Sequence, residues 1–388
     1  MIQDPLLLLA YLAGVVALVF QAARLPALAP LFARLPALVF TFFLPMLSTT
    51  AGILPAESAL YRGLARYLLP ASLVLLLLSS ELRAIARLGR TALLAMIMGM
   101  LGIALGGVVG FLVLRPWLPP ESWKAVGALT GTWTGGSANL VAVGSALALS
   151  PELQGVVIIV DTVVGYSWMG LLIALASRQQ AFDRWIGADR SVVDSVRDRL
   201  DGAPQMARPA SLADLTLLVG VAIVLTAVCL KIGALLPPVG QVLNAFGWAI
   251  VLLTSIALLL SLTPLARLEA AGASTLGYTG FYLLLASVGA QGDLRKVATH
   301  PQFVLLGVIV LAVHAVVLLA TVRLLRAPLF FFGAASQACT GGYSSAPIVA
   351  ALYEPAMAPV GLLLAVVGNI SGTYLGLVVA QILVNLSS

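Results

Sequence analysis

The sequence predicts an all-α polytopic membrane protein with two inverted repeats, each containing one helix that is interrupted at a Thr-Gly-Gly motif. First, 61% of the residues are hydrophobic and 9% are charged, whereas soluble domains carry about 25% charged residues. Second, apolar stretches of about 20 residues recur along the chain, and each is long enough to cross the ~30 Å hydrocarbon core of a bilayer. Third, Thr134-Gly135-Gly136 recurs as Thr340-Gly341-Gly342 inside an equivalent apolar stretch. Two related halves embedded in a membrane follow from these observations.

We expect twelve apolar segments. In chain order they span 4–23, 36–54, 68–80, 91–114, 124–149, 153–177, 212–232, 245–263, 276–292, 301–325, 327–352 and 356–385. The first has Asp4 in place of the basic residues that open a signal peptide, so we expect an uncleaved helix with its N-terminus outside. The third is short, and we expect it to extend toward Leu88. The chain then divides into a first repeat (1–177), a polar cytoplasmic linker (178–211) and a second repeat (212–388).

The two halves also agree on both sides of the glycine pairs. An acid-Leu-Arg step precedes the interrupted segment in each half, as Glu81-Leu82-Arg83 and as Asp293-Leu294-Arg295. After the interrupted segment, the run 165–171 matches the run 371–377 at the same spacing as the glycine pairs. Agreement at three places indicates an internal repeat.

The path of the two interrupted segments decides how the halves are related. If both segments cross, twelve spans result and the halves point the same way. If both are re-entrant, ten spans result and the halves are inverted, with the N-terminus outside and the linker inside; the loop Lys and Arg residues barely distinguish the two arrangements. We favour inversion, because a Gly-Gly pair is a natural place for a helix to unwind. Unwound backbone at membrane depth needs protein or a water-filled cavity around it, which is how secondary transporters build binding sites.

The long polar stretch at 178–211 alternates Arg with Asp residues. This mixed charge is typical of a solvated linker, which we favour over a short amphipathic helix at the membrane interface.

Neutral oxygen-bearing side chains cluster around both glycine pairs. Such groups bind hard cations or small polar solutes, while the exposed N–H groups of half-helices attract carboxylates. The predicted substrate-binding residues are Thr132, Thr134, Gly135, Gly136, Ser137 and Asn139 in the first half, and Gln337, Thr340, Gly341, Gly342, Tyr343, Ser344 and Ser345 in the second. The alternative is that these small residues only allow close helix packing, with their hydroxyls bonded back to their own helix.

Asp161 is the acidic residue set most deeply in an apolar segment, and an ionisable group there is costly unless it is paired, hydrated or liganded. Its counterpart in the second half is Asn369, two positions out of register. We predict a cation-coupling site from Ser137, Asn139, Asp161 and Asn369, with no metal beyond Na⁺. The alternative for Asp161 is a hydrated helix end or a structural pair. For His314, within an apolar segment, we favour a neutral side chain satisfied by hydrogen bonds over a proton relay.

Several function classes are excluded. The sequence has no zincin, nucleophile-elbow or phosphate-loop motif and only two histidines, so we expect no enzyme activity and no cofactor apart from Na⁺ or H⁺ as coupling ion. Its two cysteines, Cys229 and Cys339, lie in apolar segments and predict neither a disulfide framework nor a metal cluster. The net charge of +6 is explained by Arg residues at cytoplasmic loop ends, so nucleic acid is not an expected partner.

At these motifs the chain resembles the uncharacterised bacterial membrane family known as domain of unknown function 819. The resemblance covers nearly the whole length and rests on the runs 121–124 and 131–143, on Asp161 and on the step at 293–295. More distantly, the glycine breaks are similar to those of bile-acid:sodium, sodium:glutamate and 2-hydroxycarboxylate symporters. That similarity implies inverted repeats, a core domain that moves against a scaffold, often a homodimer, and a sodium-site role for Ser137 and Asn139. The second copy departs from this pattern at 343–345.

The sequence therefore predicts a multi-pass protein of the bacterial inner membrane, surrounded by lipid, that acts as a secondary active transporter. We expect an ion-coupled symporter of a small organic solute, with an anion favoured, working by alternating access at a midplane site between the two broken helices. The alternatives are a channel or passive facilitator, and a membrane sensor or assembly protein that transports nothing.

Overall fold

The computed structural model describes residues 2–35, 37–78, 85, 88–193, 196, 208–297, 300–354 and 357–387, and throughout these ranges the chain is built from helices and one isolated β-bridge. The first half contains α1 (Pro5–Ala22), α2 (Ala29–Arg34), α3 (Ala37–Thr50), α4 (Ala59–Gly63), α5 (Leu69–Leu78), α7 (Gly89–Leu114), α8 (Ser122–Gly135), α9 (Ser137–Ala146) and α10 (Pro151–Ala176). The second contains α13 (Leu212–Leu235), α14 (Ala245–Leu260), α15 (Ala273–Gly289), α16 (Leu294–Val297), α17 (Gln302–Leu324), α18 (Leu329–Tyr353) and α19 (Ala358–Ser387). In the linker, α11 spans Gln179–Ile186.

The prediction of an all-α polytopic membrane protein is confirmed. Within the described residues, seven helices are long and apolar enough to cross a membrane, or nine if two bent pairs each count as one span. Every expected apolar segment coincides with a helix. The helix of the third segment begins earlier than expected, at Ala59, and continues through a π-helical turn at Leu64–Leu68 into α5. The expected extension toward Leu88 lies mostly outside the described residues. The Glu81-Leu82-Arg83 step lies outside the described residues.

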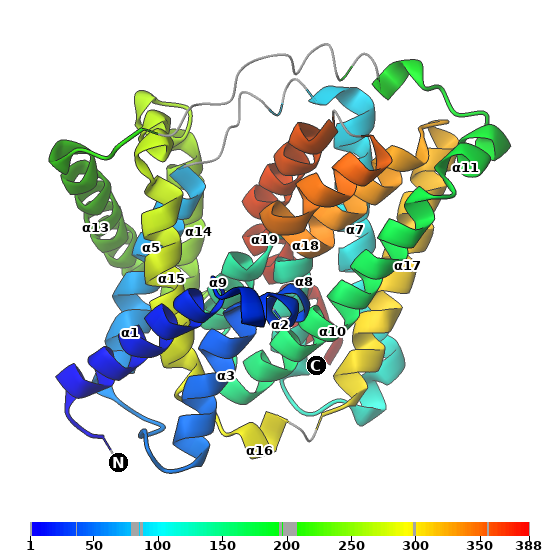
Figure 1. The fold of residues 1–388 in the computed structure, drawn as a ribbon. Helices are drawn as coiled ribbons and strands as arrows, with labels where there is room; N and C mark the ends of the chain where they lie inside the picture. Colours follow the sequence, from blue (N-terminus) through cyan, green and yellow to red (C-terminus); the bar gives the residue numbers. More distant parts are fainter. Residues whose placement is uncertain are drawn as a thin grey trace.

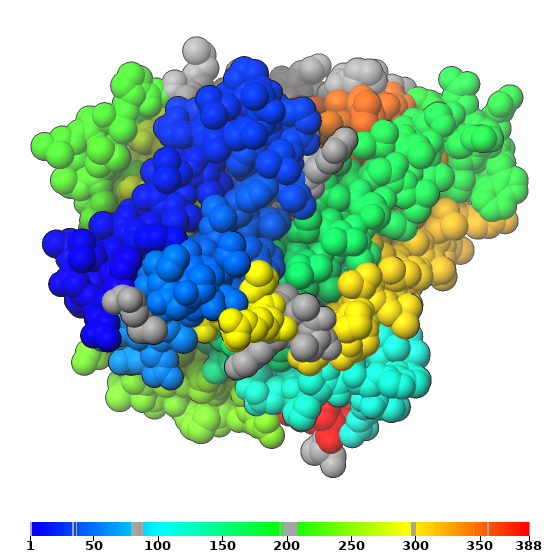
Figure 2. All heavy atoms as spheres, turned by 60° about the horizontal axis from the view of Figure 1, so that its bottom comes forward, coloured from blue at the N-terminus to red at the C-terminus, as the bar shows by residue number. Residues whose placement is uncertain are grey.

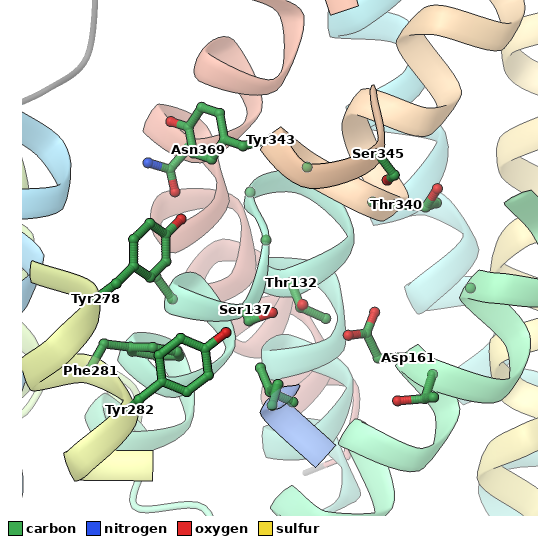
Figure 3. Close-up of a pocket in the computed structure, with 18 of the residues that line it drawn as sticks. Thr132, Ser137, Asp161, Tyr278, Phe281, Tyr282, Thr340, Tyr343, Ser345 and Asn369 are labelled. Atoms are coloured by element: carbon green, nitrogen blue, oxygen red, sulfur yellow. The ribbon is translucent and has the colours of Figure 1, made fainter. Parts of the chain in front are cut away.

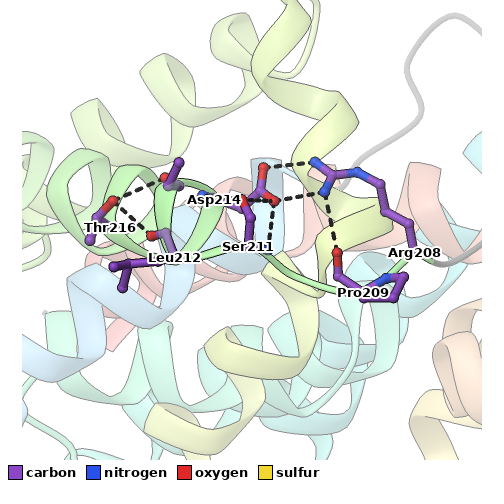
Figure 4. Close-up of polar contacts among 7 residues, drawn as sticks. Arg208, Pro209, Ser211, Leu212, Asp214 and Thr216 are labelled. Carbon is purple, nitrogen blue, oxygen red and sulfur yellow. Dashed lines mark hydrogen bonds and ion pairs between the residues drawn. The ribbon is translucent and has the colours of Figure 1, made fainter.

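Helix starts follow from capping side chains at the ends of the polar loops. Asp4 accepts a hydrogen bond from the Leu7 N–H at 2.8 Å, and Ser150 caps α10 just before Pro151. At the end of the linker, Ser211 and Asp214 form a reciprocal capping box that starts α13. Arg208 donates to both carboxylate oxygens of Asp214, at 2.6 and 2.7 Å, and so fixes the approach of the linker (Figure 4).

The helices form two bundles (Figure 1). In what we call the peripheral bundle, α15 packs on α3 and α5, and α13 packs on α14 and α5, with α1 against α3 and α15. In the core bundle, α7 packs on α17, α19 packs on both α8 and α18, and α10 packs on α18 and α17. Each half thus gives its first helices to the peripheral bundle and its last to the core bundle.

Rows of glycine bring α8 and α19 into backbone contact. Gly127, Gly131 and Gly135 recur every fourth residue on α8, and Gly368, Gly372 and Gly376 do the same on α19. A Cβ atom added at Gly372 would lie 2.8 Å from the carbonyl oxygen of Gly131, and one at Gly376 would lie 2.7 Å from that of Gly127. Small residues spaced in this way are how membrane helices approach closely without a solvent-driven hydrophobic force.

The first interrupted segment is a helical hairpin. A Cβ atom added at Gly131 would lie 3.0 Å from Val143, and one at Gly127 would lie 3.2 Å from Leu147. Residues farther before the break at Gly136 therefore contact residues farther after it. The helices α8 and α9 therefore run antiparallel, and the segment begins and ends on the same side.

The second interrupted segment, α18, folds back in the same way at Gly342. A Cβ atom at Gly333 would lie 2.5 Å from the ring of Tyr353, and Gln337 donates from its Nε2 to the hydroxyl of Ser345 at 2.6 Å. These pairs join the first part of α18 to its last part across the break.

The linker holds both ends of α18. Asp183 on α11 accepts from the backbone N–H of Leu329, at the start of α18, at 2.8 Å. Arg190 forms ion pairs with Asp183, at 3.0 Å, and with Glu354, which follows the end of α18. The expectation of an entirely solvated linker is therefore wrong for its first part, since α11 is tied to the core bundle.

Candidate functional site

The two glycine breaks face each other in the core bundle. Gly136 has φ +84° and ψ 176°, and Gly342 has φ +59° and ψ −150°. Residues that carry a Cβ atom rarely adopt either backbone conformation. A Cβ atom added at Gly342 would lie 3.9 Å from the Cα of Gly136. Two unwound backbone segments, one from each half of the sequence, are therefore adjacent.

A cavity of about 870 Å³ opens at these breaks, between the two bundles. Its walls come from α8, α9, α10, α18 and α19 on the core side and from α1, α3 and α15 on the peripheral side. Figure 2 shows one face of the molecule on which α3, in blue, meets α10, in green. Such a volume suits a small organic molecule.

Most of the predicted site residues line this one cavity. The first half contributes Thr132, Gly135, Gly136, Ser137 and Asp161, and the second contributes Gln337, Thr340, Gly341, Gly342, Tyr343, Ser345 and Asn369. Figure 3 shows residues of both halves facing the same space. The structure thus brings together positions that are some 200 residues apart in the sequence, while their role in binding stays a prediction.

Thr134 and Asn139 are predicted site residues that do not line the cavity, and the side chain of Ser344 is not described. The hydroxyl of Thr134 is buried and donates to the carbonyl of Thr130 at 2.7 Å, which matches the packing alternative for this residue. The side chain of Ser344 lies outside the described part of the structure.

Asn139 acts as a clamp between the first hairpin and α19. Its amide nitrogen donates to the carbonyl of Gly135 at 2.7 Å and to Oδ1 of Asn369 at 2.9 Å. Its own Oδ1 accepts from the hydroxyl of Thr373 at 2.5 Å. With both amide hydrogens engaged, Asn139 closes the helix packing rather than facing the cavity, which corrects its predicted placement.

Asp161, midway along α10, points its carboxylate at the cavity. The indole nitrogen of Trp133 donates to its Oδ1 at 2.8 Å. Among the residues that the structure describes, Asp161 has no basic side chain within ion-pair distance. Figure 3 places Asp161 and Asn369 on opposite sides of the breaks, so the four predicted cation ligands do not converge on one point.

His314 of α17 is fully buried beside the site and has partners for both ring nitrogens. Its Nδ1 lies 2.8 Å from the carbonyl of Gly99, which can only accept, so Nδ1 carries the proton. Its Nε2 accepts from Ser336 at 2.9 Å, and Ser336 in turn accepts from the indole of Trp168 at 2.8 Å. This chain satisfies a neutral histidine, as the sequence predicts, and joins α7, α10, α17 and α18.

Sequence reasoning missed the peripheral wall of the cavity. Arg24, just after α1, lines it, as do aromatic residues of α1 and α15, namely Phe20, Tyr278, Phe281 and Tyr282. The rings of Phe20 and Tyr282 pack edge to face with centroids 4.7 Å apart. The available signal was the spacing of Tyr278, Phe281 and Tyr282, which puts aromatic rings on one helix face.

Comparison with known proteins places the chain in a family. The model of a protein family of unknown function, DUF819, matches residues 10–386. The chain belongs to this family. A relative from Bacillus subtilis (strain 168), described as the uncharacterized membrane protein YjcL, is 26% identical over 348 residues, which cover 85% of this chain and 86% of the relative. The predicted resemblance is thereby confirmed, as is an integral membrane location.

The more distant similarity to sodium symporters stays a prediction. The cavity of this DUF819 member offers one carboxylate, and no group of three or more His, Cys, Asp or Glu side chains able to hold a metal ion is found within the described ranges. Besides this carboxylate, the cavity wall carries the guanidinium of Arg24 and the neutral oxygen atoms of hydroxyl and amide side chains.

Proposed function

We propose that this DUF819 member is a secondary active transporter of the bacterial inner membrane, an ion-coupled symporter of a small organic solute. The observation that carries the proposal is the cavity between two separately packed bundles, at the point where two unwound helices meet. Backbone of this kind at membrane depth is tolerated where it lines a binding cavity. Movement of the core bundle against the peripheral bundle would expose such a cavity first to one side and then to the other.

The hairpins support the inverted-repeat arrangement. If α8–α9 and α18 each enter and leave on one side, each half has an odd number of crossings and the second half is inverted relative to the first. Both ends of α18 contact α11 of the linker, directly or through Arg190.

An anionic solute is favoured by the charges at the cavity. The half-helices that follow the breaks start at Ser137 and near Tyr343, so the positive ends of two helix dipoles meet there. Arg24 is the basic side chain of the cavity wall, and within the described residues it has no acidic partner. Asp161 would then hold the coupling cation, so that solute and ion together neutralise the site.

The test is thermal unfolding of the purified protein against small carboxylates, amino acids and short peptides, each with Na⁺ and with K⁺ at equal ionic strength. A ligand that binds only the native state at 100 times its Kd stabilises it by about 2.7 kcal/mol, so the shift is measurable. Saturable, ion-dependent uptake of the same solute into proteoliposomes is the expected second result. Conductance without saturation would indicate a channel, and a lack of both binding and flux would contradict transport.

Replacing Arg24 with Gln is expected to weaken solute binding about fivefold, because Arg24 is exposed and an exposed charge pair contributes up to about 1 kcal/mol. The measurement is the solute concentration that gives half-maximal stabilisation. Arg66→Gln is the matched control, since Arg66 lies in the peripheral bundle but not on the cavity wall. Equal affinities for both variants and the wild type would remove Arg24 from solute recognition.

The re-entrant path of α18 predicts that its two flanks label from the same side of the membrane. The variants are Arg326→Cys, before α18, and Pro359→Cys, after it, in a background in which Cys229 and Cys339 are replaced. Both are expected to react with a membrane-impermeant maleimide from the cytoplasm. Val239→Cys, one crossing beyond the linker, should react only from outside. Labelling of the two flanks from opposite sides would show that α18 crosses.

A further inference from the structure

The short linker helix α11 turns a polar side inward and an aromatic side outward. Its buried side chains are Gln179 and Asp183. Trp185 is 65% exposed, and its ring packs edge to face against Phe182 with centroids 5.8 Å apart. A helix covered by water would bury its aromatic side chains and expose its polar ones. The reversed pattern indicates that something less polar than water covers the outer side of α11.

This helix lies where two membrane spans end. The span α10 ends at Ala176, and α11 begins at Gln179. The span α17 ends at Leu324, and Cζ of Arg323 in its last turn lies 4.5 Å from the centre of the Trp185 ring. Figure 1 shows α11 beside these ends of α10 and α17. Tryptophan is enriched at the interface between membrane and water, so lipid headgroups are the cover that fits this side of α11.

The exposed charges beside α11 are mostly basic. The backbone N–H of Asp189 donates to the carbonyl of Arg326 at 2.8 Å, which joins the chain after α11 to the chain after α17. This contact and the stacking of Arg323 gather basic residues from two segments around one short helix. Asp189 is the exposed acidic residue of the stretch 178–191. Four exposed arginines here make no ion pair with a described acidic residue, namely Arg178, Arg184, Arg323 and Arg326.

Arg323 and its neighbours suit a phospholipid better than a free phosphate ion. The Trp185 ring covers one face of the Arg323 guanidinium, whereas the N–H donors lie in its plane and stay available. A planar fork of this kind binds phosphate oxygens in pairs. Leu324 follows directly and is 84% exposed. A phosphate ion would use the charge and leave Trp185 and Leu324 uncovered, while a lipid would cover both.

The inner side of α11 holds the second hairpin. Gln179 donates from its Nε2 to Oε1 of Glu354, after the end of α18, at 3.0 Å. Asp183 binds the first backbone N–H of α18, and Arg190 joins the two buried carboxylates. Any group that fixes α11 therefore also restrains both ends of α18, the helix that contains the break at Gly342.

We propose that the outer side of α11 binds the headgroup of an anionic phospholipid, with Arg323 on the phosphate and Trp185 against the lipid, and that this lipid holds α11 against the ends of α18. The lipid site does not rest on the proposed transport function. It also lies apart from the solute cavity, whose wall includes no described residue of α11 or α17.

The experiment measures the Tm of the purified full-length protein in an uncharged detergent against short-chain phosphatidylglycerol. Phosphatidylcholine of the same chain length and inorganic phosphate are the comparison ligands. Stabilisation by phosphatidylglycerol alone is expected, because a ligand that binds the native state stabilises it. Arg323→Gln is expected to raise the half-saturating phosphatidylglycerol concentration at least about fivefold, and Trp185→Ala to raise it as well.

Arg115→Gln is the matched control. Arg115 is also exposed just after the end of a span, α7, and Trp117 beside it is 65% exposed. However, Arg115 donates to the carbonyl of Ser387 at 3.0 Å, and no described aromatic ring stacks on it. This variant is expected to bind phosphatidylglycerol like the wild type. Equal stabilisation by phosphatidylcholine or by inorganic phosphate, unchanged affinity in Arg323→Gln, or an equal loss in Arg115→Gln would overturn the site.

Hydrogen exchange tests the link to α18. Phosphatidylglycerol is expected to slow amide exchange at the start of α18, where the N–H of Leu329 binds Asp183. The protection is expected in the wild type and in Arg115→Gln but not in Arg323→Gln at the same lipid concentration. Equal protection in all three would overturn the role of Arg323. Unchanged exchange despite phosphatidylglycerol binding would keep the lipid site and remove its hold on α18.

Discussion

Replacing Gly372 with valine is expected to abolish most of the folded protein. A Cβ atom at this position would lie 2.8 Å from the carbonyl oxygen of Gly131 and 2.9 Å from the Cα of Gly135. Both are backbone atoms of α8, so no side-chain rotation relieves the contact. Overpacking of this kind costs about 1–3 kcal/mol when side chains can yield, and more when two backbones must separate.

Separation of α8 from α19 would also break the Asn139 clamp. The bonds from Asn139 to Asn369 and from Thr373 to Asn139 join α19 to α9, the second helix of the same hairpin as α8, and the loss of each would leave a buried polar group without its partner. The loss from Gly372→Val therefore exceeds the steric cost alone. The measurement is the yield of monodisperse protein after detergent extraction, together with its Tm.

Gly220→Val is the matched control, because it makes the same change in the apolar helix α13. A Cβ atom at Gly220 would meet no described atom within 4 Å. This variant is expected to extract and unfold like the wild type. Similar yield and Tm for Gly372→Val would mean that α8 and α19 are not packed as closely as described.

The helical segments could be predicted because runs of about 20 apolar residues leave few alternatives in a bilayer. The third segment was harder. Its first turns carry Arg62 and Arg66, which lower the local hydropathy and hide the start of the helix at Ala59. Arginine side chains in the first turns of a membrane helix can face the membrane–water interface or a neighbouring helix, and only the packing of the neighbouring helices decides which.

The candidate site could be predicted in part. Glycine pairs beside clusters of hydroxyl residues, repeated in both halves, revealed the breaks. Gly106-Gly107 lacks such neighbours and stays helical inside α7, where Gly106 packs against Val310 of α17. Asn139 belongs to the same polar cluster beside the break, but it bonds to Asn369 and Thr373, which are more than 200 residues away. The sequence therefore could not show whether Asn139 links two helices or binds a solute or cation. Arg24 was missed for a similar reason: it meets the cavity only because α1 packs against α15.

Replacing Gly136 with alanine is expected to abolish transport while leaving a folded protein. No described atom lies within 4 Å of a Cβ atom added at Gly136, so the substitution meets no steric barrier from its neighbours. The cost arises in the backbone, because φ +84° with ψ 176° is nearly exclusive to glycine. A strain of about 1–3 kcal/mol would be relieved by rotating the break, which redirects the N–H groups that start α9.

The measurements are solute uptake and solute-dependent stabilisation, with Tm as the check on folding. Gly220→Ala is the control with the opposite expected sign for stability, since alanine in a helix interior is more stable than glycine by roughly 0.5–1 kcal/mol. Gly136→Ala should lower the Tm by a few degrees and lose uptake, whereas Gly220→Ala should keep or raise the Tm and transport normally. Full uptake by Gly136→Ala would show that the left-handed backbone is not needed for the site.

The double variant Gly136→Ala, Gly342→Ala tests whether the two breaks act as one site. A Cβ atom at Gly342 would lie 3.9 Å from the Cα of Gly136, so the two substituted positions are in van der Waals contact. Substitutions at positions in contact are not additive, whereas distant ones add to within about 0.3–0.5 kcal/mol. A loss of stability greater than the sum of the single variants is expected. Additive losses would mean that the two unwound segments are not adjacent in the native protein, and the shared cavity would lose its structural basis.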